Sequence, residues 1–480
     1  MICNTFFIIV LILYNKYNLS LTFNIVLPFH RRIPSSTHTP TSLLSELTDT
    51  SAGVHVCIGH VQCLQLSLHM NEHATWIISS SSLQLQHQRK LINTYNKTLS
   101  NTYQCVDPTL YYFSLLQYQN GYISKDMFTF TTTYNSLIIP NYNFLLCEQY
   151  NYIDNNSGVL GLSINTNARH FLSHTNYLSQ LNTHYSNTLP LQFSFEYNNA
   201  THISTAFEGL NDISTFAKGK LVIGGAALHK GPYVNDNTIQ NKNGMYIWGG
   251  RIRSVVFDSK ETKKSVNELF EYELAFEFGY VFVPGRVHVI MEELFFKSMT
   301  HSNICDEIKF RTFYYGYICD INKEKEIINS FPQMNIRFTY GNVVLHAKDV
   351  FIKDSNTNSI VCLLVFPSEE HGSGGVNERW KFGAPFFKRQ YMLFHYNNNT
   401  ISYYIGDCNS SVMIMKWMLM CISIMCGMCW VVLLFVFKLF IYQYIYDEIS
   451  AVATTELHYT SCTFVLCNYY YKHCVNDYVF

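Results

Sequence analysis

A run of 21 residues without a charged side chain limits what the end of this chain can form: "WMLMCISIMCGMCWVVLLFVF", at 417–437. At 1.5 Å per residue, an α-helix over this run is about 30 Å long, which matches the hydrocarbon core of a bilayer. A helix of this length in a soluble protein would be expected to carry a polar face, and this run has none. The sequence therefore predicts a transmembrane helix at 416–438, followed by a short cytosolic tail at 439–480.

A second apolar segment, "FFIIVLILY" at 6–14, is too short to span a bilayer and fits the core of a signal peptide within 1–20. The alternative is a buried first strand. Residues 21–50 contain the Pro/Ser/Thr-rich stretch "RRIPSSTHTPTS" and are predicted to form a linker or pro-region.

Cysteines and glycosylation sequons favour an oxidising compartment for the segment before the apolar run. Eight of the 15 cysteines lie between 51 and 408, and an even number suits disulfides. Beyond the predicted signal peptide, Asn-x-Ser/Thr sequons begin at Asn96, Asn155, Asn199, Asn398 and Asn409. We therefore expect a single-pass membrane protein of the secretory pathway, in the endoplasmic reticulum or later, with its large portion luminal or extracellular.

Composition and patterning predict an all-β fold for that large portion. The chain has 35 Tyr and 35 Phe, and short alternating segments are separated by Asn, Gly and Pro. Helices are expected only at 168–181 and 286–299 before the apolar run. The order of segments repeats, which predicts an N-terminal β-lobe at 51–205 and a C-terminal β-lobe at 206–408. With a net charge of -1 there is no basic field for nucleic acid.

Several segments resemble the pepsin family of aspartic proteases. "VCIGHVQCLQLSLHMNEHATWIISSSS" is similar to the first catalytic segment, and "LQYQNGYISKDMFTF" to the flap hairpin, with Tyr118 as the flap tyrosine. "LVIGGAAL", "VPGRVHVIMEEL" and "WKFGAPFFKRQYMLFHYNNNTISY" resemble later segments, and "LLCEQYNYIDNNSGVLGLS" resembles the membrane-anchored plasmepsin V-like branch, related to nepenthesins. The resemblance covers about 52–408 and implies a two-lobed pepsin-like fold without a cofactor.

The resemblance also implies where two catalytic aspartates would lie, and neither is present. Counting back from Trp76 puts His69 at the first position. Counting back from Pro284 puts Ala275 at the second, and a two-residue deletion would put Glu277 there instead. His69 and Glu277 could form a different dyad, but we read both as ordinary residues of a degenerated site. Gly161 and Gly383 match the family's supporting turns.

Metal chemistry and disulfide pairing are less informative. No Cys-x-x-Cys motif or Cys/His cluster has metal-ligand spacing, so no metal site is predicted. Cysteine pairing stays open, and Cys362 with Cys305 or Cys319 is one guess. Together these features predict an inactive protease homologue that holds an extended peptide by strand addition. The alternatives are an active aspartic-type endopeptidase with an atypical site and a structural or adhesion ectodomain.

Overall fold

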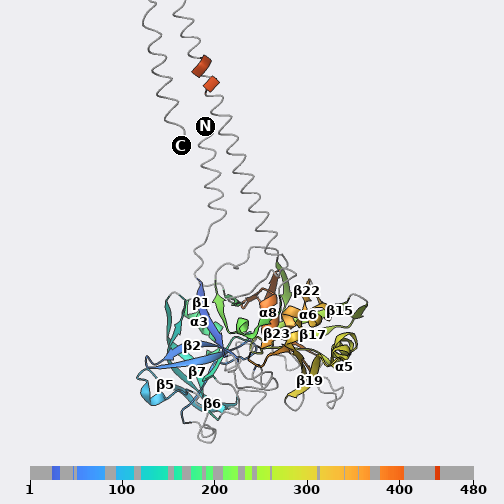
Figure 1. Cartoon of the computed structure of the whole chain (residues 1–480). Coiled ribbons are helices and arrows are strands. Elements are labelled where there is room, and N and C mark those ends of the chain that lie inside the picture. The colour runs from blue at the N-terminus through green and yellow to red at the C-terminus, as the bar shows by residue number, and fades with distance from the viewer. Residues whose placement is uncertain are drawn as a thin grey trace, which may run out of the picture. The chain divides into compact units, whose positions relative to one another are not determined.

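Strand ladders make up most of the structure, a computed structural model of the chain (Figure 1). It describes residues 24–32, 47, 51–81, 93–112, 120–133, 135–149, 156–164, 174–185, 191–197, 209–224, 233–240, 246–259, 262–310, 314–339, 341–354, 356–367, 379–404, 438–439 and 441–443. The chain divides into two units, 1–408 and 409–480. The prevalence of strands in the first unit confirms the predicted β-rich fold class.

The first sheet has 13 strands and contains a closed barrel. Its order is β12-β28-β27-β9-β11-β1-β2-β3-β8-β4-β7-β6-β5, and a further pairing of β2 with β6 closes the strands from β2 to β6 along this path into a six-stranded barrel. The strands are β1 (Ile25–Arg31), β2 (Ala52–Ile58), β3 (Gln62–His69), β4 (Trp76–Ile78), β5 (Gln104–Tyr112), β6 (Asn120–Thr131), β7 (Ser136–Gln149), β8 (Gly158–Gly161), β9 (Gln192–Tyr197), β11 (Lys218–Ile223), β12 (Tyr233–Asn237), β27 (Met392–His395) and β28 (Thr400–Tyr404).

The second sheet also has 13 strands, in the order β10-β23-β24-β20-β25-β18-β26-β17-β15-β21-β22, with β16 paired to β15 and β19 to β20. They are β10 (Asn211–Asp212), β15 (Gly249–Asp258), β16 (Lys263–Val266), β17 (Phe270–Leu274), β18 (Val281–Phe282), β19 (Cys305–Phe310), β20 (Tyr314–Asp320), β21 (Gln333–Phe338), β22 (Asn342–Leu345), β23 (Phe351–Asp354), β24 (Ser359–Cys362), β25 (Leu364–Pro367) and β26 (Trp380–Phe382). A small ribbon pairs β13 (Ile239–Gln240) with β14 (Tyr246–Ile247).

Helices are short and lie mostly in the second half. They are α3 (Tyr177–His184), α4 (Gly285–Met291), α5 (Lys297–His301), α6 (Glu324–Ser330), α7 (Ala347–Val350) and α8 (Ala384–Arg389). A π-helical turn at Glu292–Phe296 joins α4 to α5, so the helix predicted at 286–299 is confirmed. The helix predicted at 168–181 is confirmed only in its last part: α3 begins at Tyr177, where the extended Asn176 caps it by accepting the Ser179 N–H, and it ends at His184, while 168–173 lie outside the described residues.

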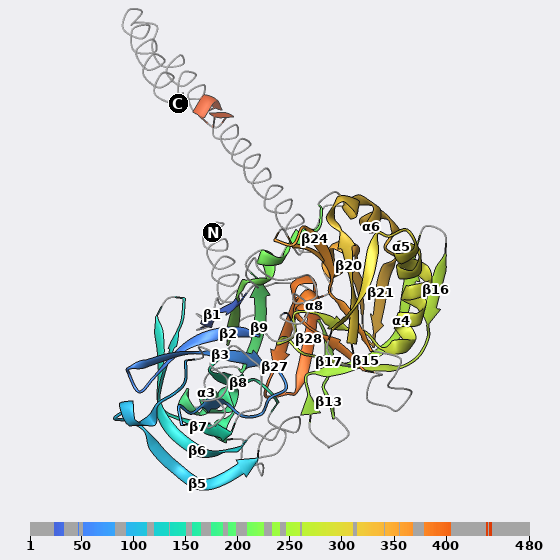
Figure 2. The ribbon, with the colours of Figure 1, turned by 60° about the horizontal axis from the view of Figure 1, so that its bottom comes forward.

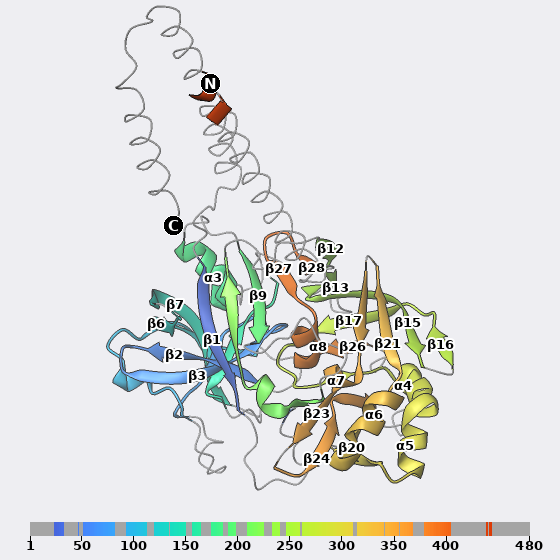
Figure 3. The same ribbon diagram turned by 45° about the horizontal axis from the view of Figure 1, so that its top comes forward.

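The two sheets do not follow the predicted lobe boundaries. β12, β27 and β28 come from the segment predicted as the C-terminal lobe, yet they extend the first sheet beyond β9. Figures 2 and 3 both show the orange β27 and β28 beside β9, between the blue-to-green strands of the first half and the yellow strands of the second. The last hairpin therefore joins the two halves of the chain.

The expectation of a linker or pro-region over 21–50 is wrong for residues 25–31. Residues 25–31 form β1, which pairs with β11 on one side and β2 on the other. The strand alternates between buried and partly exposed positions, as a half-buried strand does. The predicted signal peptide at 1–20 and the transmembrane run at 417–437 lie outside the described residues. Within the part of the chain that the structure describes, no helix has the length and apolar character needed to cross a membrane.

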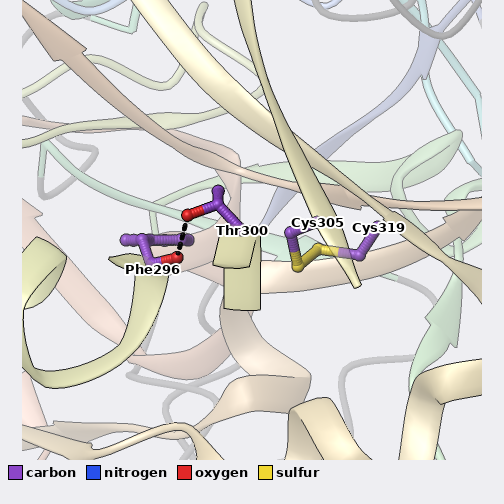
Figure 4. The surroundings of a disulfide bond; sticks show 4 residues. All are labelled: Phe296, Thr300, Cys305 and Cys319. Atoms are coloured by element: carbon purple, nitrogen blue, oxygen red, sulfur yellow. Dashed lines mark hydrogen bonds between the residues drawn. A yellow bond between two sulfur atoms is a disulfide. The ribbon is translucent and has the colours of Figure 1, made fainter. Parts of the chain in front are cut away.

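Among the described residues, two disulfides join directly opposed residues of antiparallel strand pairs. Cys57 and Cys63 connect β2 to β3 across a turn in which Gly59 adopts a positive φ of 60°. Cys305 and Cys319 connect β19 to β20, beside α5 (Figure 4). The guess that Cys362 pairs with one of these two is wrong, because the register of β19 and β20 places them opposite each other and Cys362 keeps a buried free thiol.

Candidate functional site

The same strand arrangement occurs once in each sheet. In the first, β3 runs parallel to β8, and His69 at its end lies opposite Gly161. In the second, β17 runs parallel to β26, and Leu274 at its end lies opposite Phe382. The next strand along the chain, β4 or β18, pairs antiparallel with the other side of β8 or β26. In each half, a loop therefore connects two strands that lie on either side of a third: β3 and β4 on either side of β8, and β17 and β18 on either side of β26.

The strand registers align the loop of the first sheet with the loop of the second sheet, residue by residue and without a gap. Trp76 of β4 lies opposite the second residue of β8, and Phe282 of β18 lies opposite the second residue of β26. His69 lies seven residues before Trp76, and Ala275 lies seven residues before Phe282. By this register Ala275 is the counterpart of His69. Glu277 lies two residues further along and is the counterpart of Asn71.

Glycines allow the chain to pass close beneath both loops, which we name the first loop (69–75) and the second loop (275–280). A Cβ atom on Gly161 would lie 2.6 and 2.7 Å from two carbonyl oxygens of the first loop. A Cβ atom on Gly383 would lie 2.2 and 2.3 Å from two carbonyl oxygens of the second loop. Only glycine fits such contacts without a shift of backbone. The two glycines predicted as supporting turns therefore occupy equivalent places.

Hydrogen bonds join the two loops directly. The backbone N–H of Met70 donates to Oε2 of Glu277 over 3.3 Å. The side-chain amide of Asn71 donates to Oε1 of Glu273 at 2.8 Å and to the carbonyl oxygen of Leu274 at 3.0 Å. These contacts connect residues about 200 positions apart in the sequence. They bring the first loop against the strand and loop that contain Glu277.

A buried arginine from β1 holds the second loop from the other side. The guanidinium of Arg31 donates to the carbonyl oxygen of Phe276 at 2.8 Å and to that of Glu277 at 3.2 Å. The ring of Phe276 stacks on Phe195 of β9, with centroids 3.9 Å apart. The second loop is thus fixed by the first strand of the chain as well as by the first loop. Sequence reasoning missed Arg31, since its contacts have no local pattern.

Desolvation of the imidazole ring keeps the histidine at the first position uncharged. His69 is partly exposed, and its Nε2 lies 3.5 Å from Oγ of Ser51. Desolvation lowers the pKa of His69 to about 4. The imidazole is therefore neutral at ordinary pH and able to act only as a weak base. Its counterpart Ala275 is fully buried and carries a methyl group, which neither donates nor accepts a proton.

Glu277 is buried and has an unusual ionisation. Desolvation raises its pKa to about 7, and the charge of Glu273 raises it further, while the Met70 N–H and the ammonium of Lys381 act in the opposite direction. The ammonium of Lys381, a residue of β26, lies 5.7 Å from the centroid of the Phe278 ring. Its positive charge is thus placed near the second loop.

Glu72 is a second carboxyl in this region, and sequence reasoning did not single it out. Burial raises its pKa to about 7, and repulsion by Glu277 contributes to the increase. The backbone N–H groups of His73 and Ala74 hydrogen-bond to its carboxylate and oppose the shift. Its position three residues after His69 was visible in the sequence. The resemblance implies an acid only at position 69, and the fold alone brings Glu72 close enough for the charge of Glu277 to affect its pKa.

The predicted flap segment lies in the first sheet. Tyr118 lies outside the described residues, and the described part of the predicted flap segment, 120–130, is a stretch of the single strand β6, which pairs with β5 on one side and β7 on the other. Among the residues that the structure describes, no group of three or more His, Cys, Asp or Glu side chains is placed to hold a metal ion. The site therefore consists of one neutral imidazole and two glutamates whose ionisation is linked.

Comparison with known proteins gave no match: no family model matches the chain, and none of the curated proteins matches it either.

Proposed function

We propose that this chain is a single-pass membrane protein of the secretory pathway with a pepsin-like fold, and that it binds extended peptides without hydrolysing them. The fold assignment is supported by the strand–loop–strand arrangement that occurs in both sheets, with Gly161 and Gly383 beneath the loops. Membrane anchoring rests on the uncharged run at 417–437.

The loss of activity is supported by one observation, the counterpart relation of His69 and Ala275. Hydrolysis by a carboxyl pair needs two acids that face each other, one ionised to take a proton and one protonated to donate. At the two equivalent positions this chain has an imidazole and a methyl group. The methyl group of Ala275 can neither hold a water molecule nor exchange a proton with it, so one of the two acid–base groups needed for hydrolysis is missing.

Binding of an extended peptide follows from the exposed hydrogen-bonding groups that a β-rich scaffold offers. A peptide that adds to a strand edge gains backbone hydrogen bonds without any acid–base chemistry. Loss of the acids at the two positions therefore removes turnover and leaves this mode of recognition in place.

The test is incubation of the full-length protein with a mixture of unstructured decapeptides at pH 4.5 and pH 7, followed by mass spectrometry. We expect peptides to be retained on the immobilised protein and to remain intact. Cleavage that disappears in Glu277→Ala, but persists in the matched control Glu268→Ala, would overturn the proposal. Glu268 is a suitable control because it is exposed and pairs with Arg286. Absence of retention would favour a structural or adhesion role.

One observation favours a second candidate, an active endopeptidase with an atypical site. Desolvation raises the pKa of Glu72 and of Glu277 to about 7 each, and the charge of Glu277 contributes to the shift at Glu72. Such a pair divides into one acid and one base over a range of pH. In that case cleavage would be lost in Glu72→Gln and in Glu277→Gln alike, and it would survive replacement of His69 by alanine.

A further inference from the structure

The disulfide between Cys57 and Cys63 lies on the solvent side of the barrel wall. The neighbours of the two cysteines along β2 and β3 are buried, namely Val56, Ile58 and Leu64. Cys63 itself is exposed, and Cys57 is partly exposed. Successive side chains of a strand point to opposite faces, so both sulfur atoms lie on the outer face, away from the core. A thiol in solution can therefore reach this bond while the barrel stays folded.

The other described disulfide lacks this access. Cys305 and Cys319 are only 1% and 3% exposed. Both belong to the hydrophobic core, in surroundings that include Phe296 (Figure 4). The rate of thiol–disulfide exchange depends on the access of the attacking thiolate to a sulfur atom. Reduction of the buried bond therefore requires the fold to open first, and the two disulfides should differ widely in their rates of reduction.

Cys57 is also part of the pairing that closes the barrel, which we name the barrel seam: residues 56–58 of β2 against residues 128–130 of β6. Cys57 is the middle residue of its side and lies opposite Thr129. The backbone N–H of Gly59 continues the seam by donating to the carbonyl oxygen of Met127 at 3.0 Å. The disulfide fastens β3 to β2 at this place, so its reduction removes a covalent restraint at the barrel seam.

The turn between the two cysteines is restrained by the same bond. Gly59 and His60 both have positive φ angles, of 60° and 68°. Glycine adopts this region readily, whereas the Cβ atom makes it unfavourable for a residue such as His60. Without the disulfide, the turn is free to relax toward negative φ. Relaxation at His60 would displace its neighbour Gly59 and so weaken the last bond of the barrel seam.

We propose that the disulfide of Cys57 and Cys63 is a thiol–disulfide exchange site through which a dithiol reductant loosens the barrel seam. A thiolate of the reductant attacks Sγ of Cys63, the bond between the two protein sulfur atoms breaks, and its electron pair stays on Sγ of Cys57, which takes up a proton. The second thiolate of the reductant then attacks the reductant sulfur that is bonded to Cys63. Cys63 leaves as a thiol and the reductant as a disulfide, so the dithiol supplies two electrons and two protons. The inference is independent of the proposed function.

The first test compares the reduction rates of the two disulfides in the folded, full-length protein. Free thiols are blocked with iodoacetamide, and the protein is then treated with dithiothreitol or with a folded protein that carries a reduced Cys-x-x-Cys pair. New thiols are labelled with N-ethylmaleimide and identified by mass spectrometry. With dithiothreitol we expect Cys57 and Cys63 to be labelled at least about 100-fold faster than Cys305 and Cys319. Equal rates, or labelling of Cys57 and Cys63 only in urea that unfolds the protein, would overturn the proposal. Labelling by dithiothreitol alone supports a small dithiol as the reductant, and labelling by both supports a protein dithiol as well.

Amide hydrogen exchange at Gly59 measures the effect on the barrel seam. Its protection should fall about tenfold when dithiothreitol is added to the unsubstituted protein. The amide of Val281 is the control, because it donates to the carbonyl oxygen of Leu363 at 2.8 Å in the second sheet, and its protection should stay constant. In the variant with both Cys57→Ser and Cys63→Ser, protection of Gly59 should be low from the start and dithiothreitol should not change it. Unchanged protection of Gly59 on reduction of the unsubstituted protein, or a further fall on adding dithiothreitol to the variant, would overturn the proposal.

Discussion

Substitution of Gly383 by alanine tests the loop arrangement on which the functional argument depends. The added Cβ would lie 2.2 Å from the carbonyl oxygen of Tyr280 and 2.3 Å from that of Phe278, where an ordinary contact begins at 3.4 Å. Both obstacles are backbone atoms of the second loop, so no side-chain rotation relieves them. The turn before α8 must instead move away by about 1 Å, at the expense of the bond from Ala384 N to Phe278 O. We expect a loss of about 3 kcal/mol in the free energy of unfolding.

The assay is urea unfolding of the full-length protein, followed by the fluorescence of buried tryptophans such as Trp248 and Trp380. Gly161→Ala should behave in the same way with a smaller loss, about 2 kcal/mol, because its Cβ would approach carbonyl oxygens only to 2.6 Å. Gly341→Ala is the matched control, since its Cβ would meet nothing within 4 Å. If Gly383→Ala and Gly341→Ala differ by less than about 0.5 kcal/mol, the chain does not pass beneath the second loop as described.

Three further changes have expected outcomes that the same unfolding assay measures. Arg31→Met removes the donor to the carbonyl oxygens of Phe276 and Glu277 and should lower the free energy of unfolding by about 3 kcal/mol. The control, Arg251→Met at an exposed position, should lower it by less than about 0.5 kcal/mol. Equal losses would contradict the role of Arg31. Burial lowers the pKa of His288 to about 4, so the unfolded chain binds a proton at higher pH than the folded protein does, and the free energy of unfolding decreases between pH 6.5 and pH 4. His288→Phe should make this decrease smaller by about 2 kcal/mol. If the decrease is unchanged, His288 is not its source. Replacement of Cys305 and Cys319 by alanine should lower the free energy of unfolding by about 3 kcal/mol, and replacement of Cys57 and Cys63 by about 2 kcal/mol. The difference is expected because the first disulfide closes a loop of 14 residues and the second a loop of 6. The reverse order would show that the entropy of loop closure is not the main contribution of these disulfides.

Local patterns predicted the features that depend on neighbours in the sequence. Alternation of apolar and polar residues identified the strands, and the periodicity after Pro284 identified the helical segment that begins with α4. The two glycines beneath the loops were predictable from the resemblance, and each directly follows or ends a short strand. Register places Gly161 opposite His69, and Gly383 follows Phe382, which lies opposite Leu274.

Features that depend on distant partners could not be predicted in this way. β1 is short and contains Pro28, and its main partner, β11, begins nearly 190 residues later. Arg31 reaches the second loop across 245 positions. Glu72 looked like an ordinary loop residue, since only the fold brings the charge of Glu277 near enough to alter its ionisation. The pairing of Cys305 with Cys319 likewise needed the register of β19 and β20.

The place of the last hairpin has a consequence for biosynthesis. β9 ends at Tyr197, and the strand that covers its edge, β27, begins at Met392, about 200 residues later. At about 5–20 residues per second, a ribosome needs about 10–40 s to synthesise the intervening chain. During this interval the edge of β9 has its backbone groups unpaired and is open to pairing with another nascent chain. A chaperone that occupies this edge until β27 emerges would protect the nascent chain during this interval.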